Sequence, residues 1–216
     1  MPGLIDTLTD TERASDRKLI GVAVAQVVSN LDSLGQGRVQ ISIRWLTDAQ
    51  PWARVAVLSA GHDRGTWFIP QVGDEVLVAF EHGDPLQPYV IGSLWNSTDT
   101  PPATATTDPI MRRLVKTPAG HVIELDDTKQ SITITSSSGQ KVAITPEKID
   151  LSAGNGASEV TLETSGTITL KASLKIELQA PEISISGTTL ELSADATATL
   201  KASGSCTVKG AIVEIN

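Results

Sequence analysis

Two different patterns of apolar and polar residues divide the chain. Between residues 20 and 95, short runs rich in Val and Ile alternate with clusters of Gly, Asn, Asp and Pro, which favour turns. The runs expected to form strands are Val22–Val28, Gly37–Trp45, Ala53–Leu58, Glu75–Phe80 and Tyr89–Leu94. Five short strands in about 75 residues fit a small Greek-key barrel of the OB type.

Beyond residue 131 one unit repeats: an apolar residue, a small or polar residue, then a second apolar residue. The pairs are Ile132/Ile134, Val142/Ile144, Ile149/Leu151, Val160/Leu162, Ile168/Leu170, Ile176/Leu178, Ile183/Ile185, Leu190/Leu192, Ala198/Leu200, Cys206/Val208 and Val213/Ile215. They recur at steps of 7 to 11 residues, and a short, nearly fixed period indicates a solenoid or a fibre. Because alternate residues of a strand point to one face, both members of a pair face the same way.

A single chain with two apolar residues per strand cannot close a core. Three identical chains wound together can, with each strand hydrogen-bonded to strands of neighbouring chains and the apolar side chains meeting on the threefold axis. Glycine and proline between the pairs would form the corners of a triangular prism. The sequence therefore predicts an intertwined triple-stranded β-helix, a homotrimeric needle. The residues assigned to its axial core are Ile132, Ile134, Val142, Ile144, Ile149, Leu151, Val160, Leu162, Ile168, Leu170, Ile176, Leu178, Ile183, Ile185, Leu190, Leu192, Leu200 and Val208.

The distribution of aromatic residues supports this division. All seven lie in the first 95 positions, at Trp45, Trp52, Trp67, Phe68, Phe80, Tyr89 and Trp95. Their absence from the rest of the chain fits an axial space too narrow for rings, whereas the four tryptophans of the first region are expected to be core or subunit-contact residues.

The polar run Asn96–Thr107 contains Pro101 and Pro102 and can continue neither a sheet nor a helix. We therefore predict an all-β protein with four parts. These are an N-terminal arm (1–19), an OB-fold domain (20–95), a linker (96–117) and a trimeric β-helix spike (118–216).

The charge of the chain argues against nucleic acid as a partner. The formal net charge is −8, and proteins that bind phosphate backbones present Lys and Arg on the contact face. No apolar stretch is long enough for a membrane-spanning helix, and Met1–Leu19 lacks the order of a secretory signal. Assembly in the cytoplasm of the producing cell is the expectation, and the single Cys206 has no partner for an internal disulfide.

No constellation of residues points to catalysis or metal binding. His62, His82 and His121 have no partner at metal-ligand spacing. Asp126 and Asp127 are adjacent and followed by Thr128, which favours a turn rather than a catalytic carboxylate pair. We therefore predict a protein that is not an enzyme and holds no cofactor.

Three segments of the first region carry a family resemblance: GQGRVQISIRW (Gly35–Trp45), Trp52–Val55, and AGHDRGTWFIPQVGDEVLVAFEHGDPLQPYVIGSLW (Ala60–Trp95). They resemble the injector OB domain of contractile-phage spike proteins, which also occurs in the VgrG spikes of type VI secretion. The segment Lys116–Ile144 is similar to the start of the needle in the same proteins. The resemblance implies a barrel that joins a ring-shaped baseplate hub to a β-helical needle.

The chain departs from that family in three ways. The linker is too short to hold the lysozyme domain of some members, and no histidine follows His121, so the axial His-x-His iron site of some spikes is absent. Only about 19 residues precede the barrel, so the hub is expected to be a separate polypeptide, as in a contractile phage or a phage-derived particle. The last strand is expected to end bluntly and to bind a PAAR-repeat tip protein through Val213, Glu214, Ile215 and Asn216.

The expected function is mechanical: a central spike, at the centre of a baseplate, that pierces the target cell envelope and contacts it transiently. The alternative is a trimeric fibre that binds cell-surface glycan, which would normally use exposed aromatic residues. The predicted needle has none.

Overall fold

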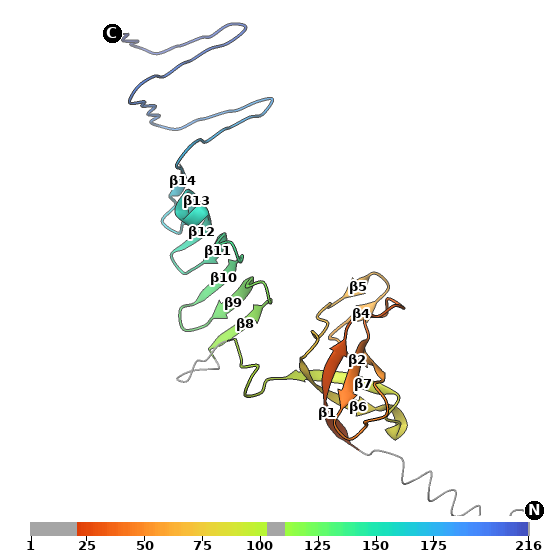
Figure 1. The fold of residues 1–216 in the computed structure, drawn as a ribbon. Coiled ribbons are helices and arrows are strands. Elements are labelled where there is room, and N and C mark those ends of the chain that lie inside the picture. The colour runs from red at the N-terminus through yellow and green to blue at the C-terminus, as the bar shows by residue number, and fades with distance from the viewer. Residues whose placement is uncertain (1–20, 103–110, 216) are drawn as a thin grey trace, which may run out of the picture. The chain divides into compact units, whose positions relative to one another are not determined.

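The computed structural model describes residues 21–102 and 111–215. The described residues form strands and two short 3-10 helices, Glu81–Gly83 and Gly154–Gly156, and contain no α-helix. The chain divides between Arg112 and Arg113 into two compact units, each visible in Figure 1. The all-β fold class is confirmed, whereas the predicted arm, residues 103–110 of the predicted linker and Asn216 lie outside the described residues.

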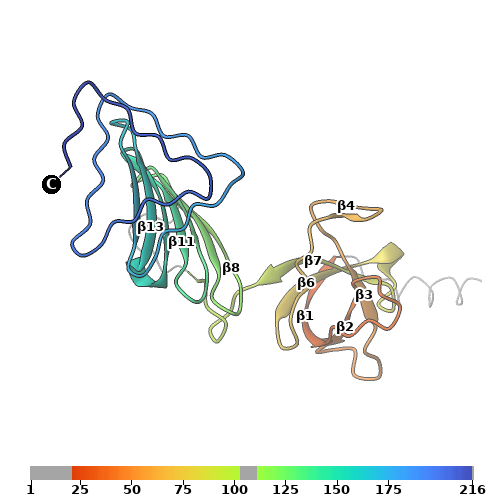
Figure 2. The same ribbon diagram turned by 90° about the horizontal axis from the view of Figure 1, so that it is seen from above.

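The first unit is a closed five-stranded barrel, which confirms the predicted OB-type fold. Its strands are β1 (Val22–Ser29), β2 (Val39–Ile43), β3 (Trp52–Val55), β6 (Glu75–Phe80) and β7 (Pro88–Leu94). They close in the order β1-β2-β3-β7-β6, as Figure 2 shows in a view along the barrel. Only β3 and β7 run parallel; the other neighbours are antiparallel.

The barrel core is aliphatic. Nine residues are at most 3% exposed: Ala25, Val27, Val39, Ile41, Ile43, Ala53, Val76, Val78 and Val90. None of the four tryptophans belongs to this core, and Trp45, Trp67 and Trp95 are exposed. Of the two roles predicted for these rings, the core role is therefore wrong, because Val, Ile and Ala already fill so small a barrel.

A two-stranded hairpin, β4 (Ala60–Gly61) and β5 (Arg64–Gly65), projects from the barrel and was not predicted. Strand β5 ends at Gly65, whose backbone has a φ of +145°. A Cβ at this position would lie 2.4 Å from the carbonyl oxygen of Ser59. Only glycine fits this backbone without strain.

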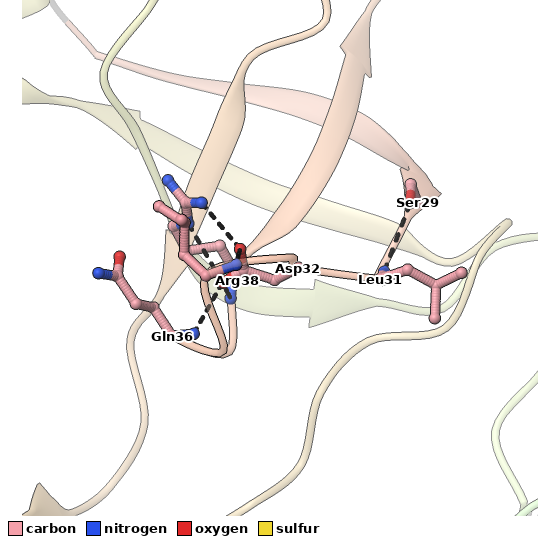
Figure 3. A network of polar contacts seen from close by, with 6 residues as sticks. Ser29, Leu31, Asp32, Gln36 and Arg38 are labelled. Atoms are coloured by element: carbon pink, nitrogen blue, oxygen red, sulfur yellow. Dashed lines mark hydrogen bonds and ion pairs between the residues drawn. The ribbon is translucent and has the colours of Figure 1, made fainter.

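Asp32 organises the loop between β1 and β2, as Figure 3 shows. Its carboxylate accepts hydrogen bonds from the backbone N–H groups of Leu34, Gln36 and Arg38 at 2.9–3.2 Å. The Arg38 guanidinium adds a bidentate ion pair, with its Nη2 2.8 Å from Oδ1 and its Nε 3.2 Å from Oδ2. The same guanidinium lies 5.5 Å from the ring centroid of Trp52. The Arg38 bond, together with the backbone donors, holds the pKa of Asp32 well below its usual range.

The second unit is a seven-stranded sheet in sequence order. Its strands are β8 (Arg112–Lys116), β9 (Val122–Asp126), β10 (Ser131–Thr135), β11 (Lys141–Ile144), β12 (Lys148–Ala153), β13 (Ser158–Glu163) and β14 (Ile168–Ala172). The five pairings from β9 to β14 are antiparallel. This arrangement differs from the prediction that every strand from Ile132 onward pairs with neighbouring chains. The reason is that each connection is a tight turn, which returns the chain beside itself.

The sheet also begins earlier than the predicted needle. Strand β8 starts at Arg112, inside the predicted linker 96–117. The Pro- and Thr-rich run ends before this point, and Leu114 and Val115 provide the apolar residues of a strand. The predicted boundary at 118 coincides instead with the turn between β8 and β9.

Residues 173–215 follow the sheet and form neither helix nor strand. Every residue of this stretch, which we call the tail, is exposed. Figure 1 shows it as a long extended path beyond β14.

Candidate assembly surface

One face of the second sheet carries two continuous columns of aliphatic side chains. Strand register places Leu125, Ile132, Ile144, Ile149, Leu162 and Ile168 side by side in the first column. It places Ile123, Ile134, Val142, Leu151, Val160 and Leu170 side by side in the second. Because the two columns are two residues apart on every strand, both lie on one face, which we call the apolar face.

The structure thus brings together ten of the residues assigned to the axial core, those from Ile132 to Leu170. Sequence reasoning missed Ile123 and Leu125, which extend the columns to β9. The signal was present, since Val-Ile-Glu-Leu-Asp shows the same alternation one strand before the first assigned pair.

Exposure on this sheet is the reverse of what a folded protein normally shows. On β12, Ile149 and Leu151 are 39% and 43% exposed, whereas the Asp150 side chain between them is 19% exposed. The same inversion holds along β9 and β10, where the column residues are exposed and most polar residues are half-buried. A contiguous exposed aliphatic surface of this kind marks an interaction site.

On the opposite face, oppositely charged side chains pair within the chain. Lys148 Nζ lies 2.8 Å from a carboxylate oxygen of Asp150, and Lys171 lies 3.7 Å from Glu159. The mutual hydrogen bond raises the pKa of Lys148 and lowers that of Asp150. This polar face is therefore suited to solvent.

The turns of the sheet form two rows on opposite margins. The first, which we call the acidic turn row, contains the connections after β9, β11 and β13. In it, Asp126 accepts the backbone N–H of Lys129 at 2.9 Å, and Asp127 pairs with Arg113 at 3.0 Å. Glu147 lies in the turn after β11, and Glu163 is the last residue of β13. Asp126 and Asp127 therefore lie in a turn, as their sequence context indicates.

The second row, which we call the hydroxyl turn row, contains the connections after β8, β10 and β12. The turns 117–121 and 136–140 are closed by backbone hydrogen bonds from Gly120 to Thr117 and from Gly139 to Ser136. The backbone N–H of Ser137 donates to His121 Nδ1 at 3.1 Å, which joins these two turns. His121 thus has a structural contact in this row.

The remaining residues assigned to the axial core lie in the tail, where the structure brings none of them together. They are Ile176, Leu178, Ile183, Ile185, Leu190, Leu192, Leu200 and Val208, all exposed. Val213, Glu214 and Ile215 of the predicted tip-binding end are exposed as well, and Asn216 is outside the described residues.

Residues 21–102 and 111–215 contain no group of three or more His, Cys, Asp or Glu residues placed to hold a metal ion. Among the same residues, no helix has the length and apolar character of a membrane span.

Comparison with protein families matches both units. Residues 23–95 match the model of the type VI secretion system/phage-baseplate injector OB domain. Residues 113–191 match the phage baseplate V C-terminal trimerisation domain, which covers the whole apolar face and the first part of the tail. The chain belongs to the phage-baseplate and type VI secretion injector spike family.

Curated members of the injector spike family share part of this chain. The type VI secretion system spike protein VgrG1a of Pseudomonas aeruginosa is 35% identical over 106 residues, which cover 43% of this chain and 16% of that protein. The actin cross-linking toxin VgrG1 and the spike protein VgrG3 of Vibrio cholerae are each 39% identical, over 74 and 72 residues. Those matches cover about a third of this chain and 7% of either relative. The chain therefore spans about a sixth or less of the length of these injector spikes.

Proposed function

We propose that this chain is the structural central spike of a contractile injection machine. It joins a baseplate hub to a tip protein and mechanically pierces the target cell envelope, and it performs no chemistry. The observation that carries this proposal is the inverted exposure on strands β9, β10 and β12, where the aliphatic residues of the two columns are exposed in the single chain.

The partner that covers the apolar face is two further copies of the chain. A sheet with one aliphatic face and one polar face makes a wall, and three such walls close a prism with its aliphatic side chains inside. The match of residues 113–191 to a trimerisation domain supports this arrangement. The tail then continues the prism as three intertwined strands, with its apolar pairs on the axis.

The proposed division of the chain follows from these roles. The barrel is the hub-proximal domain, and the sheet and tail form the needle. The proposed tip-binding segment includes Val213 and Ile215, which are exposed, and its proposed partner is a PAAR-repeat tip protein. The particle is a phage tail or a phage-derived relative, as the description of the C-terminal family model supports.

A spike must stay folded while it is driven through an envelope. Forced unfolding is governed by the unfolding rate, and interlocked chains cannot separate without breaking many inter-chain contacts together. The woven tail is therefore suited to carry load to the tip.

The test is the mass of the full chain by light scattering, compared with two variants. We expect three times the chain mass of 22.7 kDa for the wild type, with resistance to detergent. Leu151→Asp places a charge on the apolar face and is expected to abolish the trimer. Thr169→Asp, on the polar face, is the matched control and is expected to leave the trimer intact. A wild-type chain that is monomeric at all concentrations would contradict the proposal.

A further inference from the structure

One turn of the second unit contains a chemically reactive pair of residues. It is the 3-10 turn Gly154–Gly156, which joins β12 to β13. Asn155 is followed there by Gly156, and no other asparagine of the chain precedes a glycine. An Asn-Gly pair favours spontaneous loss of the side-chain amide, because the glycine nitrogen that attacks the side chain belongs to a residue without a Cβ.

This reaction needs only the chain and water. The backbone nitrogen of Gly156 forms a bond to Cγ of Asn155, and the bond from Cγ to Nδ2 breaks. The amide group leaves as ammonia, with the proton of the attacking N–H, and a five-membered succinimide remains. Water then opens either of the two ring C–N bonds. One opening gives aspartate, and the other gives isoaspartate, in which the main chain runs through Cγ.

The backbone of this turn is strained and held by few contacts. Gly154, Asn155 and Gly156 have consecutive φ values of +58°, +53° and +89°. The left-handed region is unfavourable for a residue with a Cβ, as Asn155 has. The turn is closed by a backbone hydrogen bond from the N–H of Ala157 to the carbonyl oxygen of Gly154, at 3.1 Å. Opening of the turn therefore releases Asn155 from an unfavourable conformation.

The turn also has room for the attack. Residues 154–158 are exposed, and a Cβ placed on Gly156 would have no atom within 4 Å. The Asn155 side chain lies beside the next turn of the hydroxyl turn row, with its Oδ1 3.3 Å from the position that a Cβ of Gly139 would occupy. A longer main chain at Asn155 would therefore disturb its packing against Gly139.

From these observations we infer that Asn155 is a site of spontaneous covalent modification, at which deamidation through Gly156 produces aspartate and isoaspartate. The inference concerns a single chain and does not depend on the trimer proposed above. The turns 117–121, 136–140 and 154–157 of the hydroxyl turn row contain no acidic residue, so the change places the first carboxylate among them. A spike that has been assembled for longer is expected to have a less stable sheet.

Incubation of the purified full chain under native conditions, at neutral and at mildly alkaline pH, tests the inference. Peptide mass spectrometry follows the exchange of an amide NH2 for OH, and chromatography separates the isoaspartate peptide from the aspartate peptide. We expect the Asn155 peptide to convert several times faster than the peptides that contain Asn30 and Asn96. Conversion should be faster at the higher pH, because the attacking nitrogen must lose its proton. Conversion of Asn155 no faster than that of the other two asparagines would overturn the inference.

Two glycine variants separate the chemistry from the shape of the turn. Gly156→Ala adds a Cβ to the attacking residue and is expected to slow the conversion several-fold. Gly154→Ala is the matched control, because it adds a Cβ at a positive φ of the same turn but not on the attacking residue, and the conversion is expected to stay fast. Equal slowing in both variants would overturn the role of the Gly156 nitrogen. The wild-type comparison needs no variant and stands if either variant does not fold.

The expected effect on the sheet has its own measurement. Melting curves of fresh and aged wild type are compared with those of Asn155→Asp, which supplies the charge without the longer main chain. We expect the aged protein to melt at a lower temperature than either of the other two. An aged sample rich in isoaspartate that melts like the fresh protein would overturn this effect. All these outcomes leave the proposed function standing, whereas a monomeric wild type overturns the proposed function alone.

Discussion

Strand β2 of the barrel and strand β12 of the sheet alternate apolar and polar residues in the same way but bury opposite halves of the pattern. In β2, Val39, Ile41 and Ile43 are at most 1% exposed and the residues between them are half-exposed. In β12 the apolar Ile149 and Leu151 are the exposed ones. The difference lies in closure: the barrel curls on itself and supplies its own cover, whereas the sheet stays open.

The alternation of apolar and polar residues thus determines which residues of a strand share a face, but it does not determine what covers the apolar face. The barrel satisfies the hydrophobic requirement within one chain, and its stability should not depend on protein concentration. The needle leaves its aliphatic face for other copies, so its stability should depend on concentration. The following predictions test this distinction in order of decreasing effect.

The largest effect is expected for Ile149→Ala on the apolar face. A large-to-small change at a covered position costs at least roughly 2 kcal/mol, and each trimer contains three copies, so the trimer should lose roughly 6 kcal/mol or more. Denaturant unfolding at several protein concentrations measures this loss. A loss that is independent of concentration would show that Ile149 acts within one chain.

Ile41→Ala in the barrel core is expected to cost about 2–5 kcal/mol, because Ile41 is fully buried and leaves a cavity. The loss should appear in the barrel transition, followed by tryptophan fluorescence, since all four tryptophans lie in this region. Light scattering should still report the wild-type mass. A change in mass would contradict the independence of the two units.

Gly65→Ala is expected to cost about 1–3 kcal/mol, since the new Cβ meets the Ser59 carbonyl and the backbone is strained at a positive φ. The damage should remain in the β4–β5 hairpin, where hydrogen exchange would become faster. Gly73→Ala is a useful comparison, because a Cβ there has nothing within 4 Å although φ is also positive. Similar effects at the two sites would mean that φ alone, and not the Ser59 contact, makes glycine necessary.

The smallest change at neutral pH is expected for Asp32→Asn, since Asn keeps an oxygen that can accept the loop N–H groups. The pKa of Asp32 is lowered in the folded barrel, so its carboxylate stabilises the fold fully above the unfolded value of about 4 and progressively less as the pH falls below it. Melting curves from pH 7 to pH 2 should therefore show that the wild type loses more stability than the variant. Parallel curves would contradict the role of the Asp32–Arg38 pair.

Much of the fold was readable from the sequence because the strands carry strong alternation. The run Glu75–Phe80 was predicted with the bounds that the structure shows, and the ten assigned residues from Ile132 to Leu170 lie in the two columns. The β4–β5 hairpin was not readable, because two-residue strands have no periodicity and depend on the backbone of Gly65.

The alternation also could not show whether the strands of the sheet pair within one chain or with strands of another chain. A strand shows the same period whether it pairs within its chain or with a neighbour. Only turn geometry distinguishes these cases, as in the closed turn 136–140 with Gly139. The location of the tryptophan side chains could not be predicted for a similar reason, since a large apolar ring suits either a core or an interface.

The wholly exposed tail has a consequence for how the three chains align along their length. Its apolar pairs recur every seven or eight residues from Ile176 to Ile215, so a chain displaced by one repeat still sets aliphatic residues against aliphatic residues. The sheet is not repetitive in this way, because its turns differ in length and composition, so a displacement by one strand would set unlike turns beside one another. The sheet therefore fixes how the three tails are aligned with one another along the needle axis. Tails without the sheet are expected to associate displaced from one another by whole repeats, and therefore to grow into open-ended filaments of indefinite length.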